Sequence, residues 1–426
     1  MEDSKEEPLP NIPPELTREV SDCGICIVCP ALYLTDENDG LIRPDTDRFV
    51  RLLKWLKKGG SLFPKLYLKY YEEDYREVHT KEAVDENVEV VYVPLAQIMT
   101  TDKAKSSTIG QAIRRSGYVM NCSHSWLACY LCQEKHNPKS YWKPFIDILP
   151  DKYYNMPIFF NDHYNKHLKG SYAVPLRRIG VGAVPMADML NHHPTRQTTW
   201  GYSDKKQGFV MTTTQKVGSD QQLFDSYGRK WQGRYFVNYG FTIDQNYEDN
   251  DAVIYARLED SDPLYHQKRR QLGSWTVREF QPQAHWARKA KDMMAFFRTA
   301  AATSEELARR PNFNHHISIR NESAALALLD KACDVSLGRF EHSLQHDHKL
   351  LKQNKWEDTN HRNCIIMRAG EKEVLMWYKN LSRVGRKLLT VPLKNQEAEA
   401  PAKELRLRVY YDAHIFPLVK AASRRC

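Results

Sequence analysis

The sequence of 426 residues has no apolar run long enough to cross a membrane, and its first residues, Met1 to Glu7, are acidic and polar. A spanning helix needs about 20 apolar residues, and a secretory or mitochondrial leader begins with basic ones. The chain also lacks a basic run interleaved with aromatic residues, although its formal net charge is +9. We therefore expect a soluble cytoplasmic or nuclear protein with neither a membrane nor nucleic acid as its partner.

Nine cysteines are present, and in a reducing compartment they are expected to be free thiols. Cys23, Cys26 and Cys29 form CxxCxxC, and Cys129 with Cys132 forms a second CxxC, so a zinc site is one possible interpretation. The second pair lies in SWLACYLC, where helical spacing favours thiols that face a core. His192 and His193 are adjacent and should point apart. The sequence predicts no metal site.

The composition, 42% hydrophobic and 27% charged, is that of a folded globular protein, and the length favours two domains. Residues 1–17 are rich in Glu and Pro, which predicts a flexible lead-in. We expect a first domain over residues 18–274. A second, mainly helical domain is expected over residues 275–426, because apolar residues recur there at helical spacing.

Local patterns predict several elements. Phe49, Leu52, Leu53 and Leu56 share one face of a predicted helix over 48–58, which Gly59 and Gly60 end. The run VEVVYVPL over 88–95 predicts a buried strand closed by a proline, and residues 125–131 predict a helix.

The second half of the chain changes character. Residues 180–241 alternate short apolar runs with Gly, Asp and Asn, which favours short strands and loops. Helices are predicted over 284–301, 322–340 and 344–351, the middle one with a face of Leu329, Cys333, Leu337 and Phe340. Residues 395–403, with repeated Ala and Glu, are interpreted as a loop or an insertion.

Two motifs indicate chemistry: VPMADMLNHH over 184–193 and FDSYGRKWQGRYFVNYGF over 224–241. Asn191 and His192 offer hydrogen-bonding groups after an apolar run, and Tyr227 and Tyr239 each place a hydroxyl beside a flexible glycine. This composition suits a pocket for a polar ligand. The alternative is structural: Asn191-His192 as a turn, and both tyrosines as half-buried strand residues.

In this order the two motifs resemble the SET domain, in the branch of the Rubisco large-subunit lysine methyltransferase and the actin-histidine methyltransferase. Three further segments resemble landmarks of that branch: 56–84, 140–150 and 361–378. The resemblance implies an α+β fold, in which a SET domain of short β-strands with helical insertions precedes a mainly α-helical substrate-binding domain.

The resemblance also implies a function, methyl transfer from S-adenosylmethionine to a protein substrate. It assigns Asn191 and His192 to the methyl donor, with Arg76, Glu77 and Val78 as the opposite wall of that site. It makes Tyr227 the catalytic residue. Tyr239 and Ala187 match positions that shape the channel of the target side chain. Ala187 is the feature that favours lysine over histidine as the target.

Lysine chemistry fits such a channel. A lysine amine has a reference pKa of about 10.4 and must lose a proton before it can attack. Burial beside a sulfonium cation lowers that pKa, so orienting tyrosines suffice without a carboxylate base.

The chain departs from the family pattern at three places. Residues 169–181 hold only a short segment where the family has a long helical one, and Arg177 and Arg178 do not match the spacing of its donor-binding arginine. Glu77 stands where glycine is common, and Gln232 replaces a common asparagine. Histidine methylation and an inactive SET-fold binding module therefore remain as alternatives, as does a gap in the sequence itself.

Overall fold

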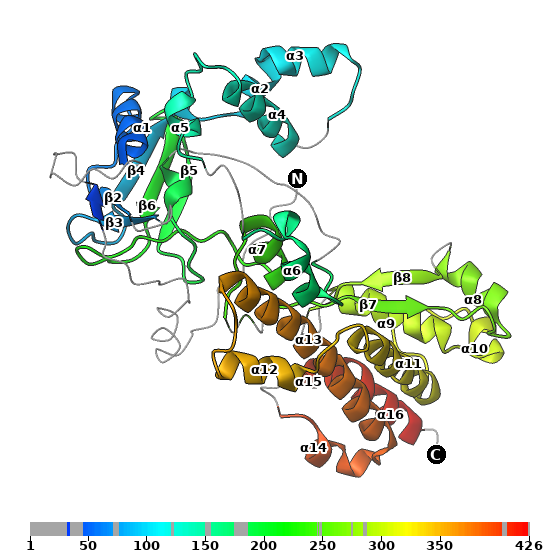
Figure 1. Cartoon of the computed structure of the whole chain (residues 1–426). Helices are drawn as coiled ribbons and strands as arrows, with labels where there is room; N and C mark the ends of the chain where they lie inside the picture. The colour runs from blue at the N-terminus through cyan, green and yellow to red at the C-terminus, as the bar shows by residue number, and fades with distance from the viewer. Residues whose placement is uncertain are drawn as a thin grey trace. The chain divides into compact units, whose positions relative to one another are not determined.

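The computed structural model describes residues 32–34, 46–70, 76–120, 123–149, 155–173, 186–244, 246, 249–273, 276–283, 288–402 and 407–424. The chain divides into two compact units, which are described separately (Figure 1). One, here called the mixed unit, spans Ile27–Tyr153 and Ile179–Arg229. The other, the helical unit, includes Tyr154–Arg178 and Lys230–Cys426.

Two antiparallel sheets of three strands organise the described residues of the mixed unit. The first has the order β1-β2-β3, with β1 Leu32–Leu34, β2 Leu66–Tyr70 and β3 Arg76–Thr80. The second has the order β4-β6-β5, with β4 Glu89–Pro94, β5 Thr198–Ser203 and β6 Gly208–Thr213. Strand β4 confirms the predicted strand. Its Val91 and Val93 are fully buried, because alternate side chains of a strand share a face.

The helices of the mixed unit are α1 Thr46–Lys58, α2 Thr101–Ser106, α3 Thr108–Arg115, α4 Ser123–Lys135 and α5 Lys143–Ile146. Helix α1 confirms the predicted amphipathic helix, since Phe49, Leu52 and Leu56 are fully buried in the core that also contains β3 and β4. The expectation that both thiols of α4 face a core was wrong for Cys132, which is exposed, whereas Cys129 is half-buried.

The helical unit contains one two-stranded sheet among its described residues. Its elements are α6 Asp162–Asn165, α7 Gln232–Tyr239, β7 Ile254–Arg257, α8 Tyr265–Leu272, β8 Val277–Phe280, α9 Arg288–Ala300, α10 Ser304–Ala308, α11 Ile319–Leu337, α12 Leu344–Lys352, α13 Thr359–Thr390, α14 Gln396–Glu399, α15 Leu407–Tyr410 and α16 Phe416–Ser423.

Helices α11 and α13 pack side by side and form the centre of this unit (Figure 1). The predicted face of α11 is confirmed: Leu329 and Cys333 are fully buried, and Leu337 and Phe340 pack against the same core. None of the described helices is at once long enough and apolar enough to cross a lipid bilayer.

The interpretation of residues 395–403 as a loop was wrong in part, because α14 lies inside this range. Gln396, its first residue, is fully buried and donates from Nε2 to the carbonyls of Leu388 and Val391, each at 2.7 Å. These two bonds fasten α14 to the end of α13, so a buried polar side chain takes the place of the apolar anchor that a sequence pattern would reveal.

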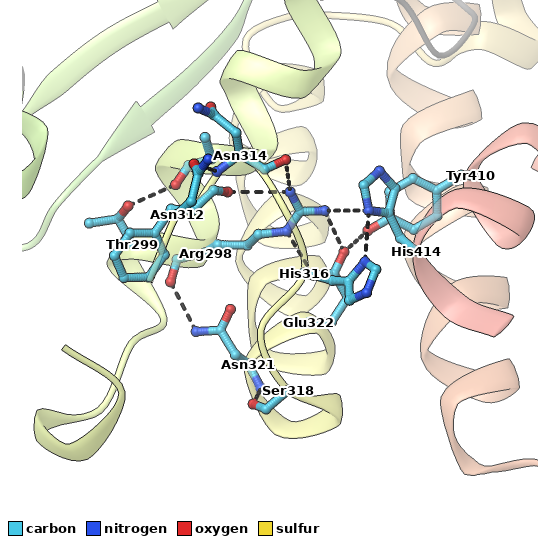
Figure 2. A network of polar contacts seen from close by, with 12 residues as sticks. Arg298, Thr299, Asn312, Asn314, His316, Ser318, Asn321, Glu322, Tyr410 and His414 are labelled. Atoms are coloured by element: carbon cyan, nitrogen blue, oxygen red, sulfur yellow. Dashed lines mark hydrogen bonds and ion pairs between the residues drawn. The ribbon is translucent and has the colours of Figure 1, made fainter. Parts of the chain in front are cut away.

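A buried ion pair joins α9 to α11 in the helical unit (Figure 2). The Arg298 guanidinium donates two hydrogen bonds to the Glu322 carboxylate, at 2.7 and 2.8 Å, and both side chains are fully buried. Tyr410 also donates to Glu322, and His414 lies 3.3 Å from the guanidinium. Burial alone would raise the pKa of Glu322, but the bonds and charge of Arg298 hold it below its ordinary value.

Several expectations concern residues outside the described ranges: the lead-in over residues 1–17, the CxxCxxC of Cys23, Cys26 and Cys29, and Arg177 with Arg178. Residues 174–181 of the shortened segment lie outside them as well. The compact units do not divide at residue 275, since Lys230 already begins a stretch of the helical unit. The boundary predicted at residue 275 separates two domains defined by sequence patterns rather than by compactness, and it stays a prediction.

Candidate functional site

One stretch of backbone, Val217 to Asp225, connects the parts of the candidate site in the mixed unit. Its middle part pairs with β3: Thr80 N–H donates to Gln221 O at 3.0 Å, and Leu223 N–H donates to Val78 O at 2.8 Å. Beyond Leu223 its hydrogen bonds pass to the loop that contains Asn191. The strand of the expected donor wall and the Asn-His motif are thus held by the same few residues.

Within β3, Val78 and Glu77 face opposite sides, as neighbours in a strand do. Val78 is fully buried in the apolar core. Glu77 is also buried, and its carboxylate lies 2.7 Å from Nε2 of His79, two positions along the same strand. The Nδ1 atom of His79 lies 3.0 Å from the Asp220 carbonyl. The Glu77 side chain that replaces a common glycine is therefore held against His79.

The Asn-His motif follows a short 3-10 helix, η6 (Ala187–Met189), that packs beside β3. Met186 enters this turn with φ of 74°, a left-handed conformation uncommon for a residue with a side chain. Burial of its side chain in the core holds it there. Ala187 is buried in the same core, so packing alone accounts for a small residue at this place.

Asp225 connects the two motifs. Its backbone N–H donates to the Asn191 carbonyl at 3.0 Å, and its own carbonyl accepts from His193 N–H at 2.9 Å. Its carboxylate accepts a hydrogen bond from the Thr198 hydroxyl at 3.1 Å. Burial raises the pKa of this carboxyl above its ordinary value. These bonds fix the backbone from which Asn191 and His192 project.

His192 and Tyr227 are in direct contact. The Tyr227 N–H donates to His192 Nδ1 at 3.0 Å, and the two rings lie 5.1 Å apart at an angle of 33°. The Tyr227 hydroxyl donates to the Leu190 carbonyl at 2.9 Å. Both side chains are half-buried. Because Nδ1 of His192 accepts a hydrogen bond, a neutral ring carries its proton on Nε2.

The other two predicted site residues, Arg76 and Tyr239, lie at the ends of their secondary-structure elements. The backbone of Arg76 pairs with Tyr70 at the start of β3. Tyr239 is the last residue of α7, where Gly240 with φ of 77° ends the helix. The alternative interpretation of the tyrosines as strand residues was wrong for both, because Tyr227 lies in no strand and Tyr239 lies in a helix. Tyr239 belongs to the helical unit, whereas the other predicted site residues belong to the mixed unit, and its channel role stays a prediction.

Gln232, noted as a departure from the family pattern, has a structural role. Its side chain is buried and exchanges two hydrogen bonds with the backbone of Ile243, at 2.5 and 2.9 Å. Sequence analysis also missed Asp225 and His79, which hold the site together. The signal for Asp225 was its place two residues before Tyr227, in the motif that was singled out.

The arrangement brings together an amide, an imidazole and a phenol on one fixed scaffold, the Asp225 segment with β3 beside it. These groups offer both donors and acceptors. They suit a polar ligand that carries amino, carboxylate or heterocyclic groups.

Comparison with known proteins defines the class. Residues 259–375 match the family model of the Rubisco LSMT substrate-binding domain. The structure of Rubisco LSMT bound to AdoMet is similar with a TM-score of 0.67 at 16% identity, over 82% of this chain and 94% of that one. The SET domain of LSMT bound to lysine and AdoHcy gives 0.66, also at 16% identity, over 80% and 92%. The chain therefore has the fold of a SET domain followed by a substrate-binding domain.

Within that class the chain is similar to actin-histidine N-methyltransferases and to Rubisco LSMT, as the sequence motifs indicated. It is 22% identical to the actin-histidine N-methyltransferase of Papio anubis, over 77% of this chain and 67% of the relative. It is 23% identical to that of Xenopus tropicalis, over 83% and 72%. The predicted α+β fold is confirmed.

Proposed function

We propose that the chain is an S-adenosylmethionine-dependent protein methyltransferase. The contact between His192 and Tyr227 carries the proposal, because it joins the residue expected at the donor to the residue expected at the reacting nitrogen. Relatives that methylate a protein and structural neighbours bound to AdoMet or AdoHcy support it.

The residues present fit the donor. Asn191 and His192 are half-buried on a backbone that Asp225 fixes, so they can receive a polar ligand without reordering. Glu77, held by His79, adds a carboxylate on the side of β3 opposite the core. The chemistry that the donor supplies is an electrophilic methyl group on a sulfonium ion, transferred to a neutral nitrogen as the carbon–sulfur bond breaks.

Tyr227 would orient the acceptor. Its hydroxyl hydrogen is given to Leu190, and a hydroxyl oxygen has lone pairs that accept. An N–H of the incoming side chain can donate to that oxygen. In an imidazole acceptor, this hydrogen bond would hold the protonated ring nitrogen. The lone pair of the other ring nitrogen would then point toward the methyl donor. The proton of the acceptor is released to water afterwards.

Histidine is the acceptor that the relatives favour, since those of Papio anubis and Xenopus tropicalis are actin-histidine N-methyltransferases. Its reference pKa of about 6.5 leaves most of the imidazole neutral at pH 7, so no deprotonation need precede the attack. We therefore place histidine ahead of the lysine expected from the sequence, with actin as the first substrate to test.

Lysine remains the second candidate, favoured by Ala187 and by structures of LSMT bound to lysine. Ala187 is a small, buried side chain, and a long aliphatic acceptor would be obstructed less by it than by a larger residue. A lysine acceptor would need its amine deprotonated on entry, which a channel of low polarity promotes.

Labelled donor tests the proposal directly. The purified chain is incubated with labelled S-adenosylmethionine and either actin or a cell extract, and the labelled protein is hydrolysed to amino acids. Labelled methylhistidine would support the first assignment and labelled methyllysine the second. A folded chain that gives no heat on titration with S-adenosylmethionine and labels no protein would instead be an inactive SET-fold binding module.

A further inference from the structure

The helical unit contains a histidine cluster apart from the residues discussed so far. Helix α6 is followed directly by the 3-10 helix η5 (Lys166–Leu168), so His163 and His167 lie four positions apart on consecutive turns. Glu357 lies just before α13, whose N-cap is Asp358. Four positions is the spacing at which two histidines on one helical face bind a metal ion.

Two contacts hold these segments together across 194 positions of sequence. His163 Nε2 lies 2.6 Å from the Glu357 carboxylate, and the Tyr164 hydroxyl donates to Asp358. Arg368, farther along α13, donates to the His167 carbonyl at 2.9 Å. These contacts bring the two histidines and Glu357 close together.

We propose that His163, His167 and Glu357 form a binding site for a divalent transition-metal ion, with Zn²⁺ the best match. One ligand atom from each residue lies within 4.8 Å of the other two. Zinc bonds of about 2.0–2.2 Å place ligand atoms about 3–4 Å apart, so small rotations of the side chains would close the site. Two imidazoles with one carboxylate suit zinc, whereas calcium and magnesium prefer oxygen ligands alone.

The Nε2 atom of His167 is the second observation that points to a ligand. It is buried and has no hydrogen-bond partner among the described residues. A buried nitrogen without a partner is costly, and a metal ion would satisfy it.

His361 supports the orientation of His167. The two rings are stacked with centroids 3.9 Å apart, and the backbone N–H of Glu357 donates to Nδ1 of His361 at 3.2 Å. This stacking restricts the orientations that the His167 ring can adopt. With three protein ligands, the remaining position would be taken by water.

The site would connect α6 and η5 to the start of α13. Binding to the folded state alone stabilises a protein by mass action. Zinc should therefore raise the melting temperature of the chain, and this effect needs no methyltransferase activity.

The test uses the full chain with Cys23, Cys26 and Cys29 replaced by serine, which removes the thiols of the CxxCxxC motif as competing ligands. After chelator treatment, Zn²⁺ is titrated calorimetrically, and Co²⁺ binding is followed by absorption. We expect saturable binding, visible cobalt bands without a thiolate charge-transfer band, and a higher melting temperature.

The variant His167→Phe keeps a ring to stack on His361 and removes the ligand nitrogen. It should weaken metal binding by more than about tenfold, since even residues behind the ligands cost that much. The matched control is His346→Phe, from the other histidine pair at four-residue spacing, whose rings lie 4.4 Å apart. The proposal is overturned if the folded parent chain shows no saturable binding, or if both variants bind as the parent does. An equal loss in both variants overturns it too.

Discussion

The backbone N–H of Tyr227 donates to Nδ1 of His192 at 3.0 Å, although the two residues are 35 positions apart. This bond makes the two motifs one structural object. The hydroxyl of the same tyrosine donates to Leu190, which precedes Asn191. A substitution of either residue should therefore alter the position of the other.

Replacing Tyr227 by phenylalanine removes the hydroxyl that donates to the Leu190 carbonyl. We expect methyl transfer to fall by about 10²-fold or more, because the acceptor nitrogen loses its orientation. Stability should fall by only about 1 kcal/mol, the net value of one such bond. Initial rates with labelled donor and thermal melts measure the two effects.

Tyr92→Phe is the control for this variant. Its hydroxyl also donates to a backbone carbonyl, that of Lys206 at 2.7 Å, but from strand β4. It should keep the activity of the parent chain. Equal rates in the parent chain, Tyr227→Phe and Tyr92→Phe would show that the Tyr227 hydroxyl has no catalytic role.

Replacing His192 by alanine removes the acceptor of the Tyr227 N–H. We expect affinity for S-adenosylmethionine to fall more than about tenfold, and stability to fall by about 1–2 kcal/mol because a partly buried amide loses its partner. Calorimetric titration of the donor measures the first effect. His193→Ala loses a comparable bond, from Thr195 N–H to Nδ1 at 3.0 Å, and should bind the donor normally. Similar affinities for the two variants would contradict a donor role for His192.

Elements that depend on apolar periodicity could be predicted from the sequence. Helix α1 is visible because Phe49, Leu52 and Leu56 recur at helical spacing and are buried in the core. Helix α14 was missed, because its anchor, Gln396, is polar and holds the helix by bonds to backbone carbonyls. A search for apolar residues at helical spacing cannot detect a helix that is held by a polar side chain.

The candidate site could be predicted only as a set of motifs. Asn191, His192 and Tyr227 were found, because they lie within the two sequence motifs over 184–193 and 224–241. The residues that position them act through the backbone, as Asp225 does toward Asn191 and His193, and any residue type except proline can make those bonds. The partner of Glu77 was hidden for a different reason: His79 is two positions away, and only the strand places both on one face.

The histidine cluster shows a similar limit. The spacing of His163 and His167 was present in the sequence, but the third residue, Glu357, is 194 positions from His163. Only the fold brings it to the pair.

The buried ion pair of Arg298 and Glu322 predicts a large effect on stability (Figure 2). Glu322→Gln leaves the guanidinium buried without its counter-charge, which costs about 3–5 kcal/mol in comparable cases. Asp260→Asn, in the exposed pair with Arg257, should leave the melting temperature close to that of the parent chain. Thermal unfolding followed by circular dichroism compares them. If Glu322→Gln has the same melting temperature as the parent chain, the ion pair does not contribute the stability assigned to it.

Glu371 predicts a dependence of stability on pH. It lies fully buried on α13, where the Ser171 hydroxyl and the Tyr172 N–H donate to its carboxyl group, the latter at 3.2 Å. Burial raises its pKa to about 8. In the unfolded chain the value returns to about 4.3. Between these values the folded state binds more protons than the unfolded state, so the free energy of unfolding falls as pH rises.

This contribution is fully present below about pH 4.3 and is lost by about pH 8, with a size on the order of a few kcal/mol. Glu371→Gln cannot ionise, so its melting temperature should fall less than that of the parent chain between pH 5 and about pH 8. All other titrating groups affect both proteins, and the difference between their curves isolates Glu371. Glu341→Gln, which changes an exposed carboxylate 3.8 Å from Lys169, is the control and should follow the parent curve. Parallel curves for the parent chain and Glu371→Gln would mean that Glu371 keeps an ordinary pKa in the folded state.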